Sequence, residues 1–108
     1  MAVPNGGEQV GVRLNRSTVI ARGKNQEAAE FATKVSSYLG ELTGVPVIWG
    51  LEVGGTVGKV HWYADYESLA ALETAFGQLA TDQGYQALLD TSVDIFVGAA
   101  EDTWVYLT

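Results

Sequence analysis

Apolar and polar residues alternate along residues 10–20, and this pattern predicts a long strand with one buried face. The apolar parity comprises Val10, Val12, Leu14, Thr18 and Ile20. In the middle of this segment Asn15, Arg16 and Ser17 are polar on both parities, which predicts a bulge or a split into two short strands. Residues 1–9 before it are rich in glycine and asparagine, so we expect a flexible leader there.

From Ala28 the apolar residues recur about every 3.6 residues, which is the period of a helix. Asn25 is the predicted N-cap, because its side chain can accept hydrogen bonds from the free amides of a first turn. Gly44 and Pro46 end the helix, since glycine adopts the left-handed cap conformation and proline cannot continue a helix. The predicted first helix therefore covers residues 26–43.

Two runs of β-branched and aromatic residues, 47–53 and 57–64, flank Gly54-Gly55-Thr56, a pattern that predicts an antiparallel hairpin. A second helix follows, capped by Asp65 or Ser68. Its apolar face comprises Leu69, Leu72, Phe76 and Leu79. Asp82-Gln83-Gly84 interrupts this helix, and a short helical turn resumes at Tyr85.

Two strand-like segments close the chain. Residues 93–97 alternate as a fourth strand, and residues 103–107 have the composition of a fifth, a candidate for exchange with a partner chain. The order β-α-β-β-α-β predicts a ferredoxin-like α+β fold, in which an antiparallel sheet carries both helices on one face and leaves the other face bare. We expect residues 10–108 to form this single domain.

Strand parity separates the two faces of the predicted sheet. The set expected beneath the helices is almost wholly apolar: Val12, Leu14, Trp49, Leu51, Val53, Val60, Trp62, Val93, Ile95 and Val97. The opposite set mixes ionisable and aromatic side chains: Arg13, Asn15, Ile48, Glu52, Lys59, His61, Tyr63, Asp94 and Phe96. Such a mixture is typical of a small-molecule pocket, which a partner subunit covering this face would close.

Composition narrows the classes of partner and cofactor. The chain has 108 residues, no cysteine, one histidine and a formal net charge of −7, and all six basic residues lie before residue 60. This balance disfavours nucleic acid and an anionic membrane surface as partners. Without thiolates and with one imidazole we expect no metal site. No apolar run is long enough to span a membrane and no signal peptide is evident, so we expect a cytoplasmic protein.

His61 is the candidate for acid/base chemistry, because an imidazole titrates near neutral pH. Lys59 and Tyr63 lie two residues away on the same face, and Tyr63 can donate a hydrogen bond to a carbonyl or enolate oxygen. The alternative is a structural histidine that bonds to a neighbouring strand or stacks at a dimer interface. Gly54-Gly55-Thr56-Val57-Gly58 is not followed by a helix, so a phosphate-binding loop is disfavoured.

Arg13 has two interpretations. It can form a cross-strand ion pair with Asp94, as Lys59 can with Glu52. Alternatively, Arg13 binds a substrate carboxylate.

The segments Val60-His61-Trp62-Tyr63-Ala64-Asp65-Tyr66-Glu67-Ser68-Leu69-Ala70 and Asp82-Gln83-Gly84-Tyr85-Gln86-Ala87-Leu88-Leu89, with the element order, resemble the dimeric α+β barrel superfamily. Within it the chain is most similar to NIPSNAP-like proteins and, more loosely, to antibiotic-biosynthesis-monooxygenase domains. The resemblance implies a homodimer whose sheets form a barrel, with a ligand cavity between helices and sheet or in the barrel mouth. Members of this superfamily include cofactor-independent oxygenases of aromatic polyketides, haem-degrading enzymes, cyclases and isomerases. The fold alone therefore does not determine the reaction.

Asn15 and Trp62 are similar to the asparagine and tryptophan of the oxygenase and haem-degrading branches. Parity places Trp62 on the opposite face from His61 and Asn15. Either the cavity therefore lies between helices and sheet, or the analogy fails. Haem bound through His61 is a weaker alternative to a reaction without a cofactor.

Two functions remain. The first is a small-molecule enzyme, without metal or nucleotide, that acts on an aromatic or polyketide-like substrate by acid/base or monooxygenase-like chemistry. Its predicted catalytic residues are His61, Tyr63 and Asn15, and its predicted substrate-binding residues are Arg13, Trp49, Trp62 and Phe96. The alternative is a non-catalytic homodimeric module for ligand binding or assembly.

Overall fold

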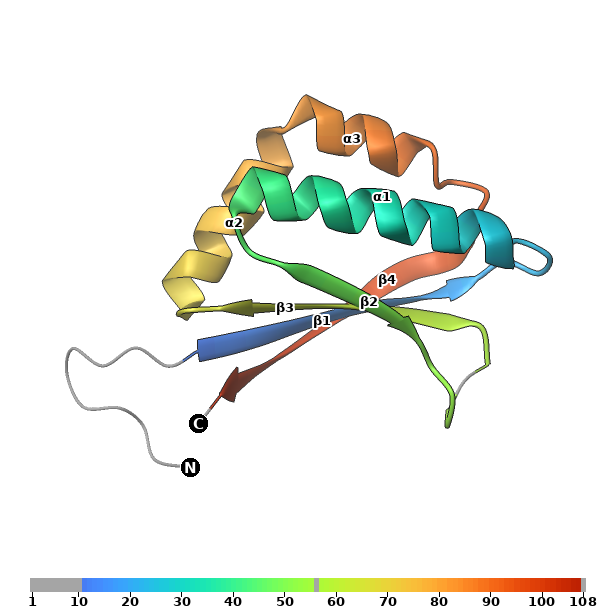
Figure 1. The fold of residues 1–108 in the computed structure, drawn as a ribbon, viewed down its shortest axis with the longest axis horizontal. Helices are drawn as coiled ribbons and strands as arrows, with labels where there is room; N and C mark the ends of the chain where they lie inside the picture. The colour runs from blue at the N-terminus through green and yellow to red at the C-terminus, as the bar shows by residue number, and fades with distance from the viewer. Residues whose placement is uncertain (1–10, 56, 108) are drawn as a thin grey trace.

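The computed structural model describes residues 11–55 and 57–107, so the predicted leader at residues 1–9 lies outside the described residues. In this part of the chain the elements are β1 (Gly11–Ile20), α1 (Asn25–Thr43), β2 (Val47–Leu51), β3 (Lys59–Tyr66), α2 (Leu69–Thr81), α3 (Gln83–Asp90) and β4 (Phe96–Leu107) (Figure 1). This order confirms the predicted β-α-β-β-α-β arrangement. The second helical element is divided at Asp82 into α2 and α3, as the interruption in its apolar pattern predicts.

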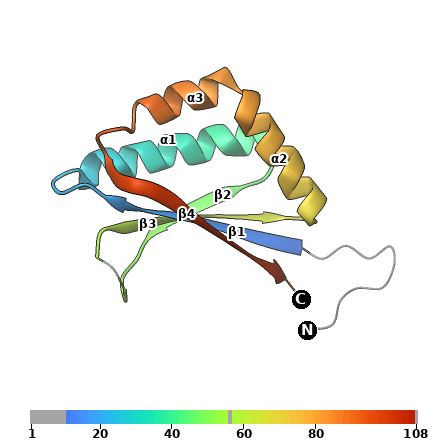
Figure 2. The same cartoon turned by 180° about the vertical axis from the view of Figure 1, so that it is seen from behind.

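The four strands form one antiparallel sheet in the order β2-β3-β1-β4. Figures 1 and 2 show α1, α2 and α3 on one face of this sheet, and no helix of the described residues covers the opposite face, which we call the open face. The fold is therefore the expected ferredoxin-like α+β fold with an open sheet. None of the helices within residues 11–55 and 57–107 is long and apolar enough to cross a membrane.

β4 joins two segments that the sequence pattern separates. It begins at Phe96 rather than Val93, because residues 91–95 form turns, and it continues to Leu107 along β1 of the same chain. The β1–β4 pairing shifts register between Ser17 and Val19, next to the predicted bulge, and β1 remains one strand. Gly98 of β4 has a φ of 72°, a conformation that residues with a Cβ rarely adopt.

Strand parity assigns the faces correctly at the centre of β1 and β3 and wrongly on β4. Val12 and Val60 are fully buried beneath the helices. Phe96 pairs with Ile20 and lies on the helix side, whereas Val97 is 58% exposed on the open face. The parity is reversed because the predicted strand began inside a turn, where side chains do not alternate. Three residues expected in the core are exposed at or beyond strand ends: Leu51, Val53 and Val93.

Side-chain caps start α2 and α3, and one of them also attaches α3 to α1. Ser68 Oγ accepts a hydrogen bond from the amide of Ala71 at 3.1 Å, and Asp82 Oδ2 accepts one from the amide of Tyr85 at 2.8 Å. The same Asp82 oxygen accepts a hydrogen bond from the Tyr38 hydroxyl of α1. This carboxylate therefore starts α3 and ties it to α1.

The predicted cap of α1 agrees with the structure at the C-terminus of the helix but not at its N-terminus. Asn25 is the first residue of α1 rather than its cap, and the cap position falls on Lys24, whose side chain makes no capping bond. Gly44 ends the helix in the left-handed conformation with a φ of 75°, and its amide donates to the Gly40 carbonyl. The predicted C-cap is thus confirmed, and the predicted N-cap is wrong by one residue.

Gly44→Ala should lower the free energy of unfolding by about 1 kcal/mol, because a Cβ crowds the neighbouring carbonyl in the left-handed conformation. Gly77→Ala is the matched control, since Gly77 lies inside α2 without a positive φ and an added Cβ meets no atom within 4 Å. That exchange should raise the free energy of unfolding by about 0.5–1 kcal/mol. Urea unfolding followed by circular dichroism measures both, and equal destabilisation of the two variants would contradict the assignment.

Candidate functional site

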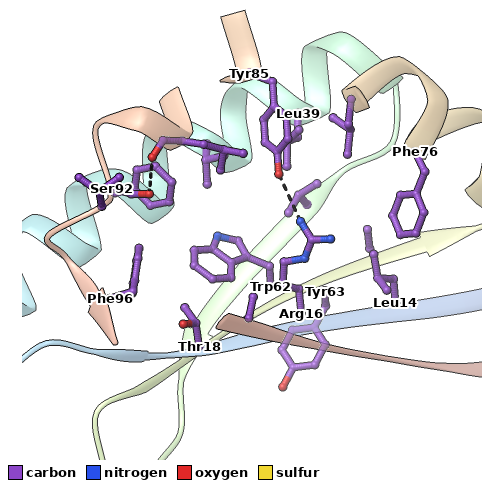
Figure 3. Close-up of a pocket in the computed structure, with 18 of the residues that line it drawn as sticks. Leu14, Arg16, Thr18, Leu39, Trp62, Tyr63, Phe76, Tyr85, Ser92 and Phe96 are labelled. Atoms are coloured by element: carbon purple, nitrogen blue, oxygen red, sulfur yellow. Dashed lines mark hydrogen bonds between the residues drawn. The ribbon is translucent and has the colours of Figure 1, made fainter. Parts of the chain in front are cut away.

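A cavity of about 380 Å³ lies between the helices and the sheet (Figure 3). Its floor comes from all four strands, β2 contributing Val47, and its walls come from α1, α2 and α3. The lining is mostly apolar and includes Leu14, Phe31, Val35, Leu39, Phe76, Leu79 and Leu89. These side chains meet here because the apolar stripes of the helices face the inward parity of the strands.

Aromatic rings form one wall of this cavity. Phe31, Trp62 and Phe96 meet edge to face, with ring centroids 5.5 to 6.4 Å apart. Trp62 and Phe96, two of the predicted substrate-binding residues, both line the cavity. The Trp62 Nε1 atom is buried and has no hydrogen-bond partner within the described residues. Trp49 packs beside this cluster on β2 but does not line the cavity.

Arg16 is the polar centre of the cavity. The β1–β4 register places it opposite Asp102. Arg16 Nε and Nη2 donate to the two Asp102 carboxylate oxygens at 2.7 and 2.8 Å, so the pair is bidentate. Arg16 Nη1 donates to the Tyr85 hydroxyl of α3 at 3.2 Å. One side chain of the sheet is therefore bonded to the edge strand and to the helix layer at once.

The pairing holds Arg16 and Asp102 in their charged forms. Hydrogen bonding to Arg16 lowers the pKa of the Asp102 carboxyl, although burial acts in the opposite direction. The same bonds raise the pKa of the Arg16 guanidinium. Burial raises the pKa of Tyr66, another lining residue, and so favours its neutral phenol. Three of the five Arg16 N–H groups bond to Asp102 and Tyr85, and the other two can donate to negative charge that develops on a bound molecule.

Arg16, Tyr85 and Asp102 were not predicted as site residues. The signal for Arg16 was its even position in β1, because a charged residue on an otherwise buried parity needs a partner. Asp102 fell in the unassigned gap between two predicted strands, so no pattern placed it opposite Arg16.

The predicted catalytic residues lie together on the open face. His61 Nδ1 is 3.1 Å from Asn15 Oδ1, and His61 Nε2 is 2.7 Å from Glu52 Oε1. The Tyr63 ring stacks on the imidazole with centroids 5.9 Å apart, and Figure 3 shows that ring pointing away from the cavity. Both imidazole nitrogens are thus engaged by protein groups. The parity argument correctly separated His61 and Asn15 from Trp62.

The cross-strand ion pairs differ from those predicted. Arg13 bonds to Asp65 at 2.7 and 2.9 Å rather than to Asp94, because Asp65 is its register partner on β3 and Asp94 lies in a turn. The Glu52 carboxylate bonds to His61 Nε2, and Glu52 meets Lys59 through the backbone, where its amide donates to the Lys59 carbonyl at 2.9 Å. Arg13 is consequently paired on the open face and does not line the cavity.

The described residues hold no group of three or more His, Asp and Glu side chains that could bind a metal ion. His61, the residue considered for haem, does not fit an axial ligand in this structure. Its two nitrogens face Asn15 and Glu52, and an axial ligand needs one nitrogen free.

Asp102→Asn should lower the free energy of unfolding by about 1 kcal/mol near neutral pH. The effect is modest because a third of the Arg16 side chain is exposed and solvent screens the ion pair. The folded pKa of Asp102 lies below its unfolded value. The stabilisation is therefore complete above about pH 4 and disappears as the pH falls through the folded pKa. The free energies of unfolding of wild type and Asp102→Asn should accordingly become equal in acid.

Urea unfolding at a series of pH values measures this difference. Asp65→Asn is the control, because the Arg13–Asp65 pair is about half exposed and such pairs contribute little. A difference between wild type and Asp102→Asn that persists unchanged in acid would contradict the assignment.

No protein-family model and no curated protein matches the sequence. Solved structures match the fold. A NIPSNAP family protein from Agrobacterium tumefaciens is 22% identical with a TM-score of 0.76, over 91% of this chain and 93% of its own. An uncharacterized NIPSNAP domain protein from Burkholderia xenovorans is 16% identical with a TM-score of 0.77, over 90% of this chain and 94% of its own. The chain therefore has the ferredoxin-like α+β fold that these NIPSNAP-family structures share.

Proposed function

We propose that the protein binds a small, largely apolar molecule, aromatic or polyketide-like, in the cavity between helices and sheet and transforms it without metal or nucleotide. The observation that carries this proposal is the cavity of about 380 Å³, whose size falls within the range of ligand pockets. Its aromatic wall and its charged centre complement a flat molecule that carries one polar group.

The chemistry proposed is acid/base or monooxygenase-like. A substrate of this kind loses a proton from carbon to water or a buffer base more readily when hydrogen-bond donors stabilise the resulting anion. The remaining N–H groups of Arg16 and the Tyr85 hydroxyl are such donors, and Trp62 and Phe96 line the cavity with them. A carbanion formed in this way can react with dioxygen directly, so the protein's part is to bind, orient and stabilise.

Anthrone is a suitable probe, because one anthrone and one dioxygen give one anthraquinone and one water. Wild-type protein should accelerate anthraquinone formation, followed by absorbance and oxygen uptake. Leu89→Trp should lower the rate on the order of tenfold or more, because the larger side chain enters the cavity and displaces the substrate. Leu88→Trp is the matched control, since Leu88 lines the outer groove between α1 and α3.

His61→Ala in the same assay separates the cavity from the predicted open-face residues. If the reaction takes place in the cavity, the rate of this variant should stay close to that of wild type. If His61, Tyr63 and Asn15 catalyse it, the variant should lose the reaction. A wild-type rate equal to the buffer rate, or equal losses in Leu88→Trp and Leu89→Trp, would refute the cavity proposal.

A homodimeric module is the second candidate, and the apolar character of the open face favours it. The exposed apolar side chains on this face are Ile48, Tyr63, Val97, Val105 and Leu107. Exposed apolar residues on a sheet face that no helix of the described residues covers are typical of a protein interface. A second copy packed on it would bring the two sheets face to face, as in the dimeric barrel that the sequence resembles.

Val105→Asp should convert a dimer of this kind into a monomer, because an unpaired carboxylate would be buried between the sheets. Val53→Asp is the control, since Val53 is 99% exposed in the turn after β2 and lies off the sheet. Sedimentation velocity measures the mass of each. A wild-type chain that sediments as a monomer, or a Val105→Asp variant that remains dimeric, would refute this interface.

A further inference from the structure

The Arg16–Tyr85 hydrogen bond fixes the direction of the next bond at Tyr85. An arginine side chain can only donate hydrogen bonds, so at 3.2 Å the Tyr85 oxygen is the acceptor. The phenolic proton of Tyr85 is then free to donate. Within residues 11–55 and 57–107 no group accepts it.

Most of the hydrogen-bonding groups of the Arg16–Asp102 pair are engaged with each other or with Tyr85. Three of its five N–H groups are bonded, two to Asp102 and one to Tyr85. Both Asp102 carboxylate oxygens accept from Arg16. The centre of the cavity therefore offers hydrogen-bond donors, while the positive charge of Arg16 is balanced by Asp102.

The surroundings of this donor are apolar. Figure 3 shows Arg16 and Tyr85 pointing toward one another from the sheet and from α3, with Trp62 on one side and Leu14 and Phe76 on the other. A ligand atom that reaches the Tyr85 proton therefore leaves the rest of the ligand among hydrocarbon side chains. A carbonyl oxygen, which only accepts, can be satisfied by the Tyr85 proton alone and needs no acceptor from the cavity.

We infer that the ligand of this cavity is a neutral aromatic carbonyl compound whose oxygen accepts a hydrogen bond from the Tyr85 hydroxyl. Arg16 polarises that phenol by donating to its oxygen, which strengthens the bond that the phenol donates in turn. This inference rests on the proposed function, because it names the substrate class of the same cavity. It makes Tyr85 the residue that selects a carbonyl over a hydrocarbon of the same shape.

Titration calorimetry with 2-acetylnaphthalene and 2-ethylnaphthalene tests this selection, because the two probes differ only in the carbonyl oxygen. Wild-type protein should bind the ketone about three- to tenfold more tightly, as expected for one net hydrogen bond. Tyr85→Phe keeps the ring and removes the donor, so the preference for the ketone should fall below about twofold while the affinity for the hydrocarbon stays unchanged.

Tyr106→Phe is the matched control. Tyr106 lies on β4, is 50% exposed and does not line the cavity. This variant should keep the wild-type preference. The infrared carbonyl band of the bound ketone, labelled with carbon-13, should lie at lower frequency in wild type and in Tyr106→Phe than in Tyr85→Phe.

The outcomes separate this inference from the proposed function. Equal affinity of wild type for the two probes, or a preference that survives in Tyr85→Phe, overturns the carbonyl assignment and leaves the ligand cavity standing. Loss of the preference in Tyr106→Phe also overturns it. If neither probe binds, the proposed function falls and the carbonyl assignment falls with it.

Discussion

The pairing of Arg16 with Asp102 is the interaction on which the site depends. A guanidinium on the helix side of β1 must be neutralised and hydrogen-bonded, because an unpaired charge in that apolar layer is strongly disfavoured. Only the second part of β4 brings a carboxylate opposite it, and the register shift after Ser17 sets that alignment. The conformation of Gly98 and the length of β4 are therefore linked to the polar centre of the cavity.

Arg16 also connects the helix layer to the sheet by a hydrogen bond. Its remaining bond goes to Tyr85 of α3, and α3 is itself fixed by Asp82, which caps it and accepts a bond from Tyr38 of α1. A chain of hydrogen bonds thus runs from the edge strand through β1 to two helices. Lining side chains stand on both sides of the Arg16–Tyr85 bond, with Trp62 on one side and Leu14 and Phe76 on the other (Figure 3).

The two faces of the sheet hold different chemistry. The helix side has a cavity with an aromatic wall, an ion pair and phenols. The open face has His61, held between Asn15 and Glu52 and stacked on Tyr63, together with exposed apolar residues. Two engaged nitrogens suit a structural histidine, whereas spare donors in a largely apolar cavity suit a ligand site.

The sequence alone determined the element order, the α+β class, the interruption at Asp82 and the separation of His61 from Trp62, because each follows from local periodicity or from strand parity. Trp62 and Phe96, which the sequence singles out, line the cavity, although strand parity places Phe96 on the wrong face. The tertiary structure decided that Arg16, Tyr85 and Asp102 meet, since they lie up to 86 residues apart. Periodicity describes neighbours within an element, whereas that meeting depends on the strand register and on the angle at which α3 returns over the sheet.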